Sequence, residues 1–257
     1  MSDERRRPRR GGLEGNLRTA AVWTQVRDLA KERQAELSRP LRVLDLGGGT
    51  GGLAVGLAEQ GHSVTVVDPS ADALASLRRR VSESPAAGRI SAVQGDADTL
   101  DGIVATGSVD LVCCHDTLEV TDDPAATTAR IAEVLAPGGH LSLVTAQRVA
   151  AVLSRALAGR FDQARAVLTA TDGRWGPTDP APRRFDRDRV LDLLGRAGFT
   201  ILDVRGVRLF SDLVPSALVD SEADRLALLE LEELAATDRE HPGLSELGTS
   251  MHVLARR

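Results

Sequence analysis

The feature that most restricts the fold is a regular alternation of short apolar runs and helical segments over residues 41–146. The apolar runs are rich in Val, Leu and Ile, as is typical of buried parallel strands. They cover residues 41–46, 63–68, 89–96, 109–114 and 140–146. The helical segments between them cover residues 52–61, 71–84 and 124–136. This alternation predicts βαβ units, and hence an α/β fold with a parallel sheet and helices on both faces.

The flanking segments extend this pattern and interrupt it once. Residues 16–38 carry apolar side chains at helical spacing and predict an amphipathic helix, which Pro40 ends. Residues 148–184 break the alternation with a helical piece (149–170) and a loop. The pattern then resumes as a helix, a strand, an acidic helical stretch and a last strand, at residues 186–198, 199–210, 217–238 and 251–256.

The ends of the chain differ in character. Residues 1–12 are charged and aperiodic, so we expect a disordered basic arm. Residues 13–257 are predicted to form a single domain, with an insertion at about 148–185.

Composition excludes several classes of protein. A membrane-spanning helix needs about 18 consecutive apolar residues, and no apolar run in the 257 residues approaches that length. No apolar stretch follows the first basic residues, so we expect no secretory signal. Cys113 and Cys114 are adjacent and poorly placed for a disulfide, which suits a cytoplasmic protein. No metal site is predicted, because ligand spacing is lacking at His62, His140, His241 and His252.

A glycine-rich turn follows the first predicted strand. Gly47, Gly49 and Gly52 fit the pattern G-x-G-x-x-G, which alone indicates a dinucleotide pyrophosphate at the next helix N-terminus. Asp45 lies two residues before Gly47, at the carboxyl end of the strand, where ligands of such sheets bind. A carboxylate there repels a pyrophosphate but attracts the ammonium and sulfonium groups of S-adenosylmethionine. The turn therefore favours S-adenosylmethionine, and a nicotinamide oxidoreductase is the rival interpretation.

Acidic residues also follow the second and third predicted strands. Asp68 can accept hydrogen bonds from both ribose hydroxyls, a role that nicotinamide and adenosylmethionine sites share. Asp96 can accept from the adenine amino group while the N–H of Ala97 meets the ring nitrogen N1. Taken alone, Asp96 is equally consistent with a helix cap. Three acids at the ends of three successive strands favour the adenosylmethionine site.

These motifs resemble those of class I S-adenosylmethionine-dependent methyltransferases over residues 41–146. The resemblance implies a Rossmann-like methyltransferase domain with a mostly parallel seven-stranded sheet whose last strand is antiparallel, which suits residues 251–256. It is carried by Asp45-x-Gly47-x-Gly49-x-Gly51, Asp68, Gly95-Asp96-Ala97, Asp110-Leu111-Val112 and Leu135-Ala136-Pro137-Gly138-Gly139.

A narrower resemblance, to bacterial tRNA 5-carboxymethoxyuridine methyltransferases, covers nearly the whole chain. Its segments are Gly15-Asn16-Leu17-Arg18, His115-Asp116-Thr117-Leu118-Glu119, residues 158–162, 206–210 and 228–232, and His252-Val253. Those enzymes esterify the carboxymethoxy group of the wobble uridine. The resemblance implies that Arg18 pairs with the methionine carboxylate, whereas without it Arg18 reads as a solvated helix charge. The cofactor contacts that it implies are Arg18, Gly47, Gly48, Asp68, Asp96, Ala97 and His115.

The acceptor region departs from those relatives. An aromatic–amide pair is expected after the fifth strand, but the chain has Ala146-Gln147, and arginines follow Phe161 where the relatives are lysine-rich. Aromatic side chains here can stack on bases, although core aromatics beside solvated arginines are an equal interpretation. The residues predicted to contact the acceptor are Gln147, Phe161, Arg174 and Trp175.

Charge is distributed unevenly within the net value of −5. Residues 1–40 carry 10 basic and 6 acidic residues, and residues 148–210 carry 12 and 7, while the rest of the chain is acidic. By the resemblance, both basic segments lie on the substrate side. This arrangement suits an anionic acceptor such as a tRNA anticodon loop.

His115, after the fourth strand, has three interpretations: a base for a hydroxyl acceptor, a hydrogen-bond partner of the cofactor, or a satisfied strand-end histidine. A carboxylate acceptor is already anionic at pH 7 and needs no base. The sequence thus predicts a cytoplasmic methyltransferase for the carboxylate of wobble 5-carboxymethoxyuridine. The alternatives are a methyltransferase for a small carboxylic acid or hydroxylated metabolite, and an adenosylmethionine-binding module without activity.

Overall fold

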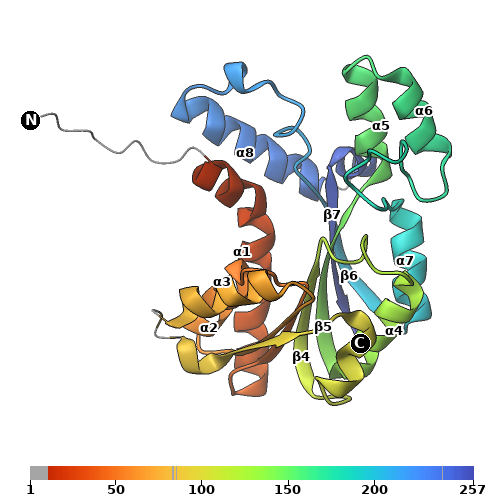
Figure 1. Ribbon diagram of the computed structural model, residues 1–257. Coiled ribbons are helices and arrows are strands. Elements are labelled where there is room, and N and C mark those ends of the chain that lie inside the picture. Colours follow the sequence, from red (N-terminus) through yellow and green to blue (C-terminus); the bar gives the residue numbers. More distant parts are fainter. Residues whose placement is uncertain (1–10, 83, 85, 239) are drawn as a thin grey trace, which may run out of the picture.

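The computed structural model describes residues 11–82, 84, 86–238 and 240–257. Its strands are β1 Arg42–Leu46, β2 Ser63–Asp68, β3 Ile90–Gln94, β4 Val109–His115, β5 Leu135–Ala146, β6 Thr200–Val207 and β7 Ser250–Arg256. They form one sheet in the order β3-β2-β1-β4-β5-β7-β6 (Figure 1). β7 is antiparallel to β5 and β6, and the other pairs are parallel. The predicted α/β fold with an antiparallel last strand is confirmed.

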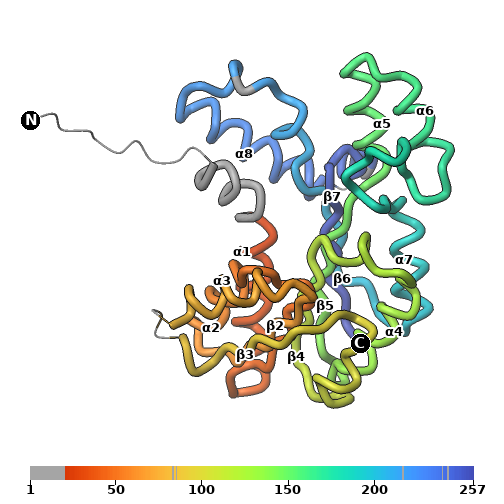
Figure 2. The backbone as a smooth tube through the Cα atoms, in the orientation of Figure 1, coloured from red at the N-terminus to blue at the C-terminus, as the bar shows by residue number. Residues whose placement is uncertain are grey.

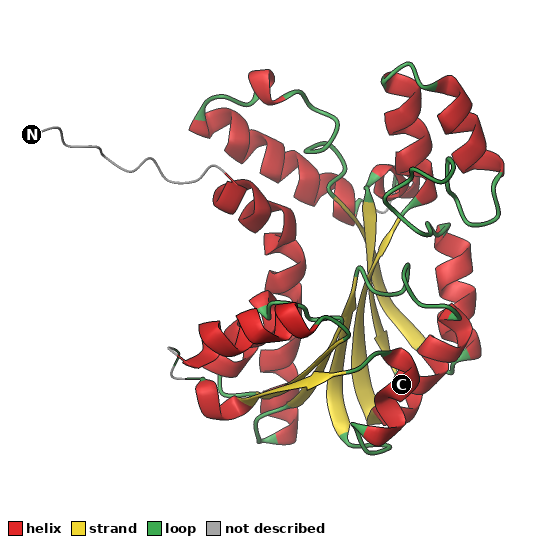
Figure 3. Ribbon diagram, viewed as in Figure 1, coloured by secondary structure: helices red, strands yellow, loops and turns green. Residues whose placement is uncertain are grey.

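Helices pack on both faces of the sheet (Figure 1, Figure 3). Within the described residues the α-helices are α1 Gly11–Leu37, α2 Gly52–Glu59, α3 Ala71–Ser82, α4 Pro124–Val134, α5 Arg148–Leu157, α6 Phe161–Thr169, α7 Arg187–Arg196 and α8 Glu222–Thr237. One apolar core lies between the sheet and α1–α3, and the other between the sheet and α4 and α7. Neighbouring strand residues point to opposite faces, so that Val43 joins the first core and Leu44 the second.

Helix α1 begins earlier than predicted. Residues 1–10 of the predicted basic arm lie outside the described residues, but Gly11 and Gly12 belong to α1 rather than to a disordered arm. Glycine costs about 1 kcal/mol relative to alanine in a helix without excluding it. Because no proline stands between Pro8 and Pro40, no residue without a backbone N–H interrupts the helix.

Residues 148–184 leave the carboxyl edge of the sheet and return to the same place. The predicted helical piece is two helices, α5 and α6, because Gly159 turns the chain with a φ of 69°. Gln147 pairs with Phe185 in a parallel bridge, and the Phe185 N–H donates to the Ala146 carbonyl at 2.9 Å. Figure 2 shows α5 and α6 standing beyond the strand ends as a result.

Helix α8 flanks the same edge from the opposite side (Figure 3). Its Glu232 carboxylate accepts hydrogen bonds from three consecutive backbone N–H groups after β6, those of Leu209, Phe210 and Ser211, at 2.7, 2.9 and 2.6 Å. This contact joins two of the segments that carry the narrower resemblance. It holds α8 beside the carboxyl edge, where the predicted cofactor residues gather.

Asp110 ties the start of β4 to the segment before β1. Its buried carboxylate accepts two hydrogen bonds from Arg39, both at 2.8 Å, and one from the Arg42 N–H at 2.8 Å. Burial alone would raise the pKa of Asp110, but the hydrogen bonds from Arg39 and Arg42 outweigh it and hold the pKa well below its usual range. The ionised carboxylate therefore stabilises the central strand pair.

Replacing Asp110 with Asn is expected to lower the free energy of unfolding by about 2 kcal/mol at pH 7, because a buried charge-assisted network loses its acceptor. Urea denaturation measures this. Since folding lowers the pKa of Asp110, its contribution is present above an unfolded pKa of about 3.9 and is lost as the pH falls below it. Asp98→Asn removes a mostly exposed ion pair with Arg130 and should cost under about 1 kcal/mol. Equal losses in the two variants would contradict the argument.

Candidate active site

In the turn after β1, the backbone of Gly47 and Gly48 packs directly against neighbouring side chains, which leaves no room for a Cβ at either position. Gly47 has a φ of +74°, and a Cβ placed there would lie 2.0 Å from Thr117 Oγ1. A Cβ on Gly48 would lie 2.5 Å from Asp45 Oδ2. The Thr117 hydroxyl is itself held by the Leu46 carbonyl at 3.1 Å. The predicted glycine turn is thus a tightly packed floor at the carboxyl edge of β1 and β4.

Asp68 and Asp96 border this turn on the side of β2 and β3. The Asp68 carboxylate accepts from the Gly49 N–H at 2.9 Å and from the Ser70 N–H at 2.8 Å. Asp96 Oδ1 caps the 3₁₀ turn Ala97–Gly102 by accepting from the Asp98 and Thr99 N–H groups at 3.0 and 3.1 Å. The helix-cap role considered for Asp96 is therefore present. Its contact with adenine stays a prediction, as does that of Ala97.

A cavity of about 200 Å³ opens above the glycine turn. Of the predicted cofactor residues it is lined by Asp45, Gly47, Gly48 and His115, whereas Gly49, Asp68, Asp96 and Ala97 do not line it. Small-molecule sites usually measure about 300–1,000 Å³, so this cavity suits only part of a cofactor. Arg18 lies on α1, but its side chain is outside the described residues.

Asp45 is the strongest indication of a cationic ligand. Its side chain is only 4% exposed and lines the cavity. Burial, and secondly the charge of Asp68, raise the pKa of Asp45 to about 7. Among the described residues no hydrogen-bond donor offsets that burial. An ammonium or sulfonium group would do so, and this fits the predicted S-adenosylmethionine.

Trp23, Asp116 and Arg208 are among the residues that line the cavity without having been predicted. Asp116 and Arg208 are unusual among non-glycine residues because their φ angles are positive, 51° and 59°. Burial raises the pKa of Asp116, and the charge of Arg208 opposes that rise. Both lie in segments that carry the narrower resemblance, and that resemblance was the sequence signal by which they could have been predicted. Trp23 gave none, since it reads as one more apolar position of the helix.

The side chain of Gln147 is not free to contact a methyl-acceptor substrate in this structure. Its side chain is buried, and its amide nitrogen donates toward three carbonyl oxygens, those of Ser245, Gly248 and Ser250, at 2.9, 2.9 and 3.1 Å. The amide is used to join the end of β5 to the start of β7. We therefore no longer propose Gln147 as a substrate residue.

Trp175 and Arg174 are also engaged within the chain. The guanidinium carbons of Arg155 and Arg184 lie 4.1 and 4.6 Å from the Trp175 ring centre. Arg184 is held in turn by a bidentate pair with the buried Asp179, at 2.6 and 3.0 Å. The Arg174 guanidinium faces the Gly176 carbonyl at 3.4 Å. The structure thus gives Trp175 cation–π partners in place of a free stacking face. Of the predicted acceptor aromatics, only Phe161 is well exposed, at 71%.

Two further classes of feature were searched for. In the described part of the chain, no cluster of His, Cys, Asp or Glu is arranged to hold a metal ion. No described helix combines the length and apolar character needed to cross a membrane.

Known proteins match this chain at two scales. Residues 43–139 match the family model for a methyltransferase domain. Over 247 residues, the chain is 32% identical to a tRNA 5-carboxymethoxyuridine methyltransferase of Escherichia coli O157:H7, which covers 96% of this chain and 90% of that protein. A ubiquinone biosynthesis O-methyltransferase of Xanthomonas oryzae pv. oryzae is 35% identical over 134 residues, covering 51% of this chain and 53% of that protein.

Solved structures show the same fold. Magnesium protoporphyrin IX methyltransferase from Synechocystis PCC 6803, with bound S-adenosylhomocysteine, superimposes with a TM-score of 0.59 at 17% identity. The match covers 94% of this chain and 86% of that one. The chain belongs to the S-adenosylmethionine-dependent methyltransferases. It is an enzyme of that class with S-adenosylmethionine as its cofactor, and it is similar over its length to the tRNA 5-carboxymethoxyuridine methyltransferases.

Gly47→Ala is expected to reduce affinity for S-adenosylhomocysteine at least tenfold, because the added Cβ collides with Thr117 at the floor of the cavity. Calorimetric titration measures the affinity. Gly107→Ala is the matched control: Gly107 has a φ of +65°, and a Cβ there meets no atom within 4 Å. Both variants carry about 1–2 kcal/mol of backbone strain, but only Gly47→Ala should lose binding. A binding loss of the same size in Gly107→Ala would refute the steric argument.

Affinity for S-adenosylmethionine is expected to rise about sevenfold between pH 6 and pH 7.2, because Asp45, with a pKa of about 7, ionises over that range. Burial lowers the pKa of His115 to about 4, so this imidazole stays neutral throughout. Calorimetry in buffers of constant ionic strength measures the dependence. Asp45→Asn should bind more weakly and lose most of the slope. A slope that persists in Asp45→Asn would assign it to another group, such as Asp116.

Proposed function

We propose that this enzyme methylates the carboxylate of 5-carboxymethoxyuridine at the wobble position of tRNA, and so acts in the cytoplasm. The observation that carries the proposal is the 32% identity to a tRNA 5-carboxymethoxyuridine methyltransferase across 96% of the chain. The similarity includes α5, α6 and α8, which flank the carboxyl edge outside the matched methyltransferase domain. These elements surround the edge of the sheet where an acceptor would enter, so similarity there bears on the acceptor.

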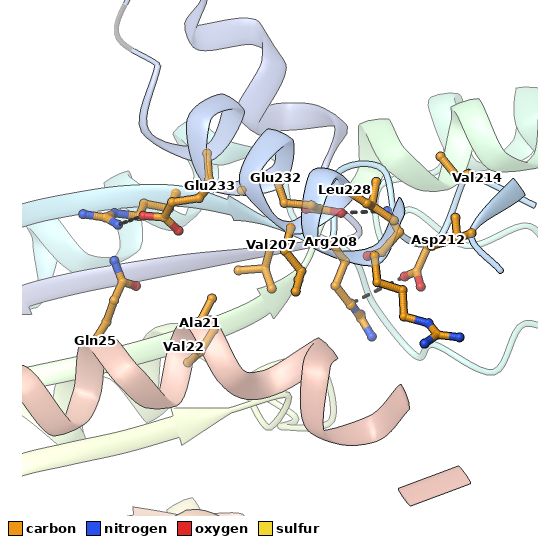
Figure 4. A pocket seen from close by; sticks show the side chains of 17 residues that line it. Ala21, Val22, Gln25, Val207, Arg208, Asp212, Val214, Leu228, Glu232 and Glu233 are labelled. Atoms are coloured by element: carbon orange, nitrogen blue, oxygen red, sulfur yellow. Dashed lines mark hydrogen bonds and ion pairs between the residues drawn. The ribbon is translucent and has the colours of Figure 1, made fainter. Parts of the chain in front are cut away.

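A second cavity supports an acceptor site beside the cofactor cavity. It measures about 410 Å³, within the usual range for small-molecule sites, and lies between α1, β6 and α8 (Figure 4). Figure 4 shows Ala21, Val22 and Gln25 on its α1 side and Leu228, Glu232 and Glu233 on its α8 side. Val22, Val207 and Arg208 line both cavities.

Arg208 stands where the two cavities meet and is the cation best placed to hold an acceptor carboxylate. Its guanidinium is anchored by the Ser250 hydroxyl at 3.1 Å and lies 3.5 Å from Asp212. Arginine presents a planar fork of donors that suits a carboxylate. When bound, S-adenosylmethionine supplies an electrophilic methyl group. An acceptor carboxylate is already anionic, so the residues of this chain need only hold and orient it.

The tip of the α5–α6 hairpin supports contact with the RNA. Phe161 is exposed there beside the exposed Arg160 and Arg165, and Leu157 and Leu168 are 69% and 61% exposed. An exposed aromatic ring between arginines can stack on an unpaired base while the cations meet phosphates. We propose Phe161 as an RNA contact on this basis.

A second candidate is a methyltransferase for a small carboxylic acid or hydroxylated metabolite. The 35% identity to a ubiquinone biosynthesis O-methyltransferase favours it, although that match covers 51% of this chain. The same cofactor cavity would serve either acceptor. A module that binds the cofactor without turnover would instead leave every acceptor unmodified.

The test incubates the purified protein and methyl-labelled S-adenosylmethionine with tRNA that carries 5-carboxymethoxyuridine, and in parallel with a small-molecule extract. Mass analysis of the digested nucleosides should find the label in the methyl ester of 5-carboxymethoxyuridine. At a subsaturating cofactor concentration, Gly47→Ala should strongly reduce the product and Gly107→Ala should retain it. Label confined to small acids would refute the tRNA proposal, and no label in either arm would refute both acceptors.

The hairpin tip provides a separate control on the RNA contact. Phe161→Ala combined with Arg160→Gln is expected to raise the KM for tRNA about tenfold without changing the affinity for S-adenosylhomocysteine, because these side chains lie outside both cavities. An unchanged KM would remove the α5–α6 tip from the proposed RNA surface.

A further inference from the structure

A continuous chain of five polar side chains crosses the sheet from the cofactor cavity to its outer edge. His115 on β4 contacts Ser142 on β5, with 2.8 Å between Nε2 and Oγ. The same Ser142 Oγ lies 2.8 Å from Nε2 of His252 on β7. His252 Nδ1 lies 2.7 Å from the side-chain amide of Gln25 on α1. The other end of that amide lies 2.7 and 2.8 Å from Nη1 and Nε of Arg205 on β6.

Arg205 gives this chain a direction. A guanidinium carries only donors, so the amide atom of Gln25 that faces it must be the oxygen. The amide nitrogen then faces His252 and donates to its Nδ1 at 2.7 Å. Arg205 is held by Asp203 at 2.5 Å and Glu233 at 3.3 Å, so its position is fixed. Any other orientation of Gln25 would put its NH₂ group against the guanidinium.

The donor–acceptor order set by Arg205 extends to His115 because neither histidine is charged and each therefore carries a single ring proton. Burial, with smaller effects from His115 and Arg205, lowers the pKa of His252 to about 3, and burial lowers the pKa of His115 to about 4. Since His252 Nδ1 accepts from Gln25, its single proton is on Nε2 and is donated to Ser142. The Ser142 hydroxyl is fully buried, and its only neighbours at hydrogen-bond distance among the described residues are the two imidazoles, so its one proton is donated to His115 Nε2. The proton of His115 is then on Nδ1.

We propose that this row of hydrogen-bonded side chains fixes His115 as the Nδ1–H tautomer. His115 then presents a hydrogen-bond donor, rather than a base, to a carboxylate in the cofactor cavity. Among the described residues Nδ1 has no partner, and the His115 side chain lines the cofactor cavity. Arg205, Gln25, His252 and Ser142 act as positioning residues. The identity of the ligand carboxylate rests on the proposed function, while the tautomer does not. A donor at this place suits a carboxylate acceptor and excludes the general-base role considered for His115.

Histidine tautomers are read directly by two-bond ¹H–¹⁵N correlation spectra of the full chain without ligand. The expected result is the Nδ1–H form for His115 and the Nε2–H form for His252. Single substitutions of the five histidines assign the signals. An Nε2–H form of His115, or a mixture of the two, would overturn the proposal whatever the enzyme methylates.

Gln25→Glu tests whether the hydrogen bonds from Arg205 to Ser142 set the tautomer of His115. A carboxylate accepts from both Arg205 and His252, so neutral His252 must donate from Nδ1 and accept at Nε2. Every hydrogen bond beyond it reverses, and His115 is expected to change to the Nε2–H form. Gln25→Met keeps the length of the side chain but leaves the direction undetermined, so both forms should appear. A His115 that stays in the Nδ1–H form in both variants would refute the role of the chain.

Binding measurements on Gln25→Glu distinguish the two sources of the carboxylate. If the cofactor supplies it, affinity for S-adenosylhomocysteine should fall at least tenfold while affinity for 5′-methylthioadenosine, which lacks the amino-acid end, is unchanged. If the acceptor supplies it, both affinities are unchanged and the KM for the acceptor rises at least tenfold. Because Gln25 also lines the acceptor cavity, the KM must rise as well in Ser142→Ala, which interrupts the hydrogen bonds at a side chain that lines neither cavity. No change in any of these values would refute the contact between His115 and a ligand carboxylate.

Discussion

The close approach of backbone to backbone at the end of β1 is the constraint on which the site depends. The Gly47 N–H donates to the Val67 carbonyl at 2.7 Å, and the Gly49 N–H donates to the Asp68 carboxylate at 2.9 Å. The Thr117 hydroxyl donates to the Leu46 carbonyl from the other side. The turn is thus fixed to both neighbouring strand ends. Side chains are excluded from it, so the space above the turn is left for a ligand, with the Asp45 carboxylate buried beneath.

Residues close together in sequence were predictable, and contacts between distant elements were not. Asp45, Gly47 and Gly48 follow one strand, and the periodicity that predicts the strand also places them at its carboxyl end. His115 was placed in the same way, at the end of β4. No local sequence pattern could show that His115 is connected to Arg205 by hydrogen bonds through three other side chains. The five residues lie on five separate elements, β4, β5, β7, α1 and β6. Such a network depends on the strand order, in which β7 lies between β5 and β6.

The acceptor residues were less predictable because polar side chains also serve the fold. Gln147 and Trp175 looked available in the sequence, but the first is saturated by carbonyl oxygens and the second is covered by guanidinium groups. Several arginines in residues 148–210 are likewise engaged in contacts within the fold. Arg148 donates to the Val167 and Thr171 carbonyls and pairs with Asp186, and Arg184 pairs with Asp179. Counting charges by segment therefore overstates the positive surface that an RNA would meet.

Helix α1 connects the features that define the reaction. Its Val22 lines both cavities, its Trp23 lines the cofactor cavity, and its Gln25 carries the hydrogen-bond direction from Arg205 to His252. A shift of α1 would therefore alter the walls of both cavities and the tautomer of His115 together. Because Gln25 contacts Arg205 only while α1 lies against β6, the proposed donor at His115 is defined only in the arrangement in which α1 forms a wall of both cavities. The position of α1 therefore couples the shape of the cofactor cavity to the proposed orientation of the proton that faces it.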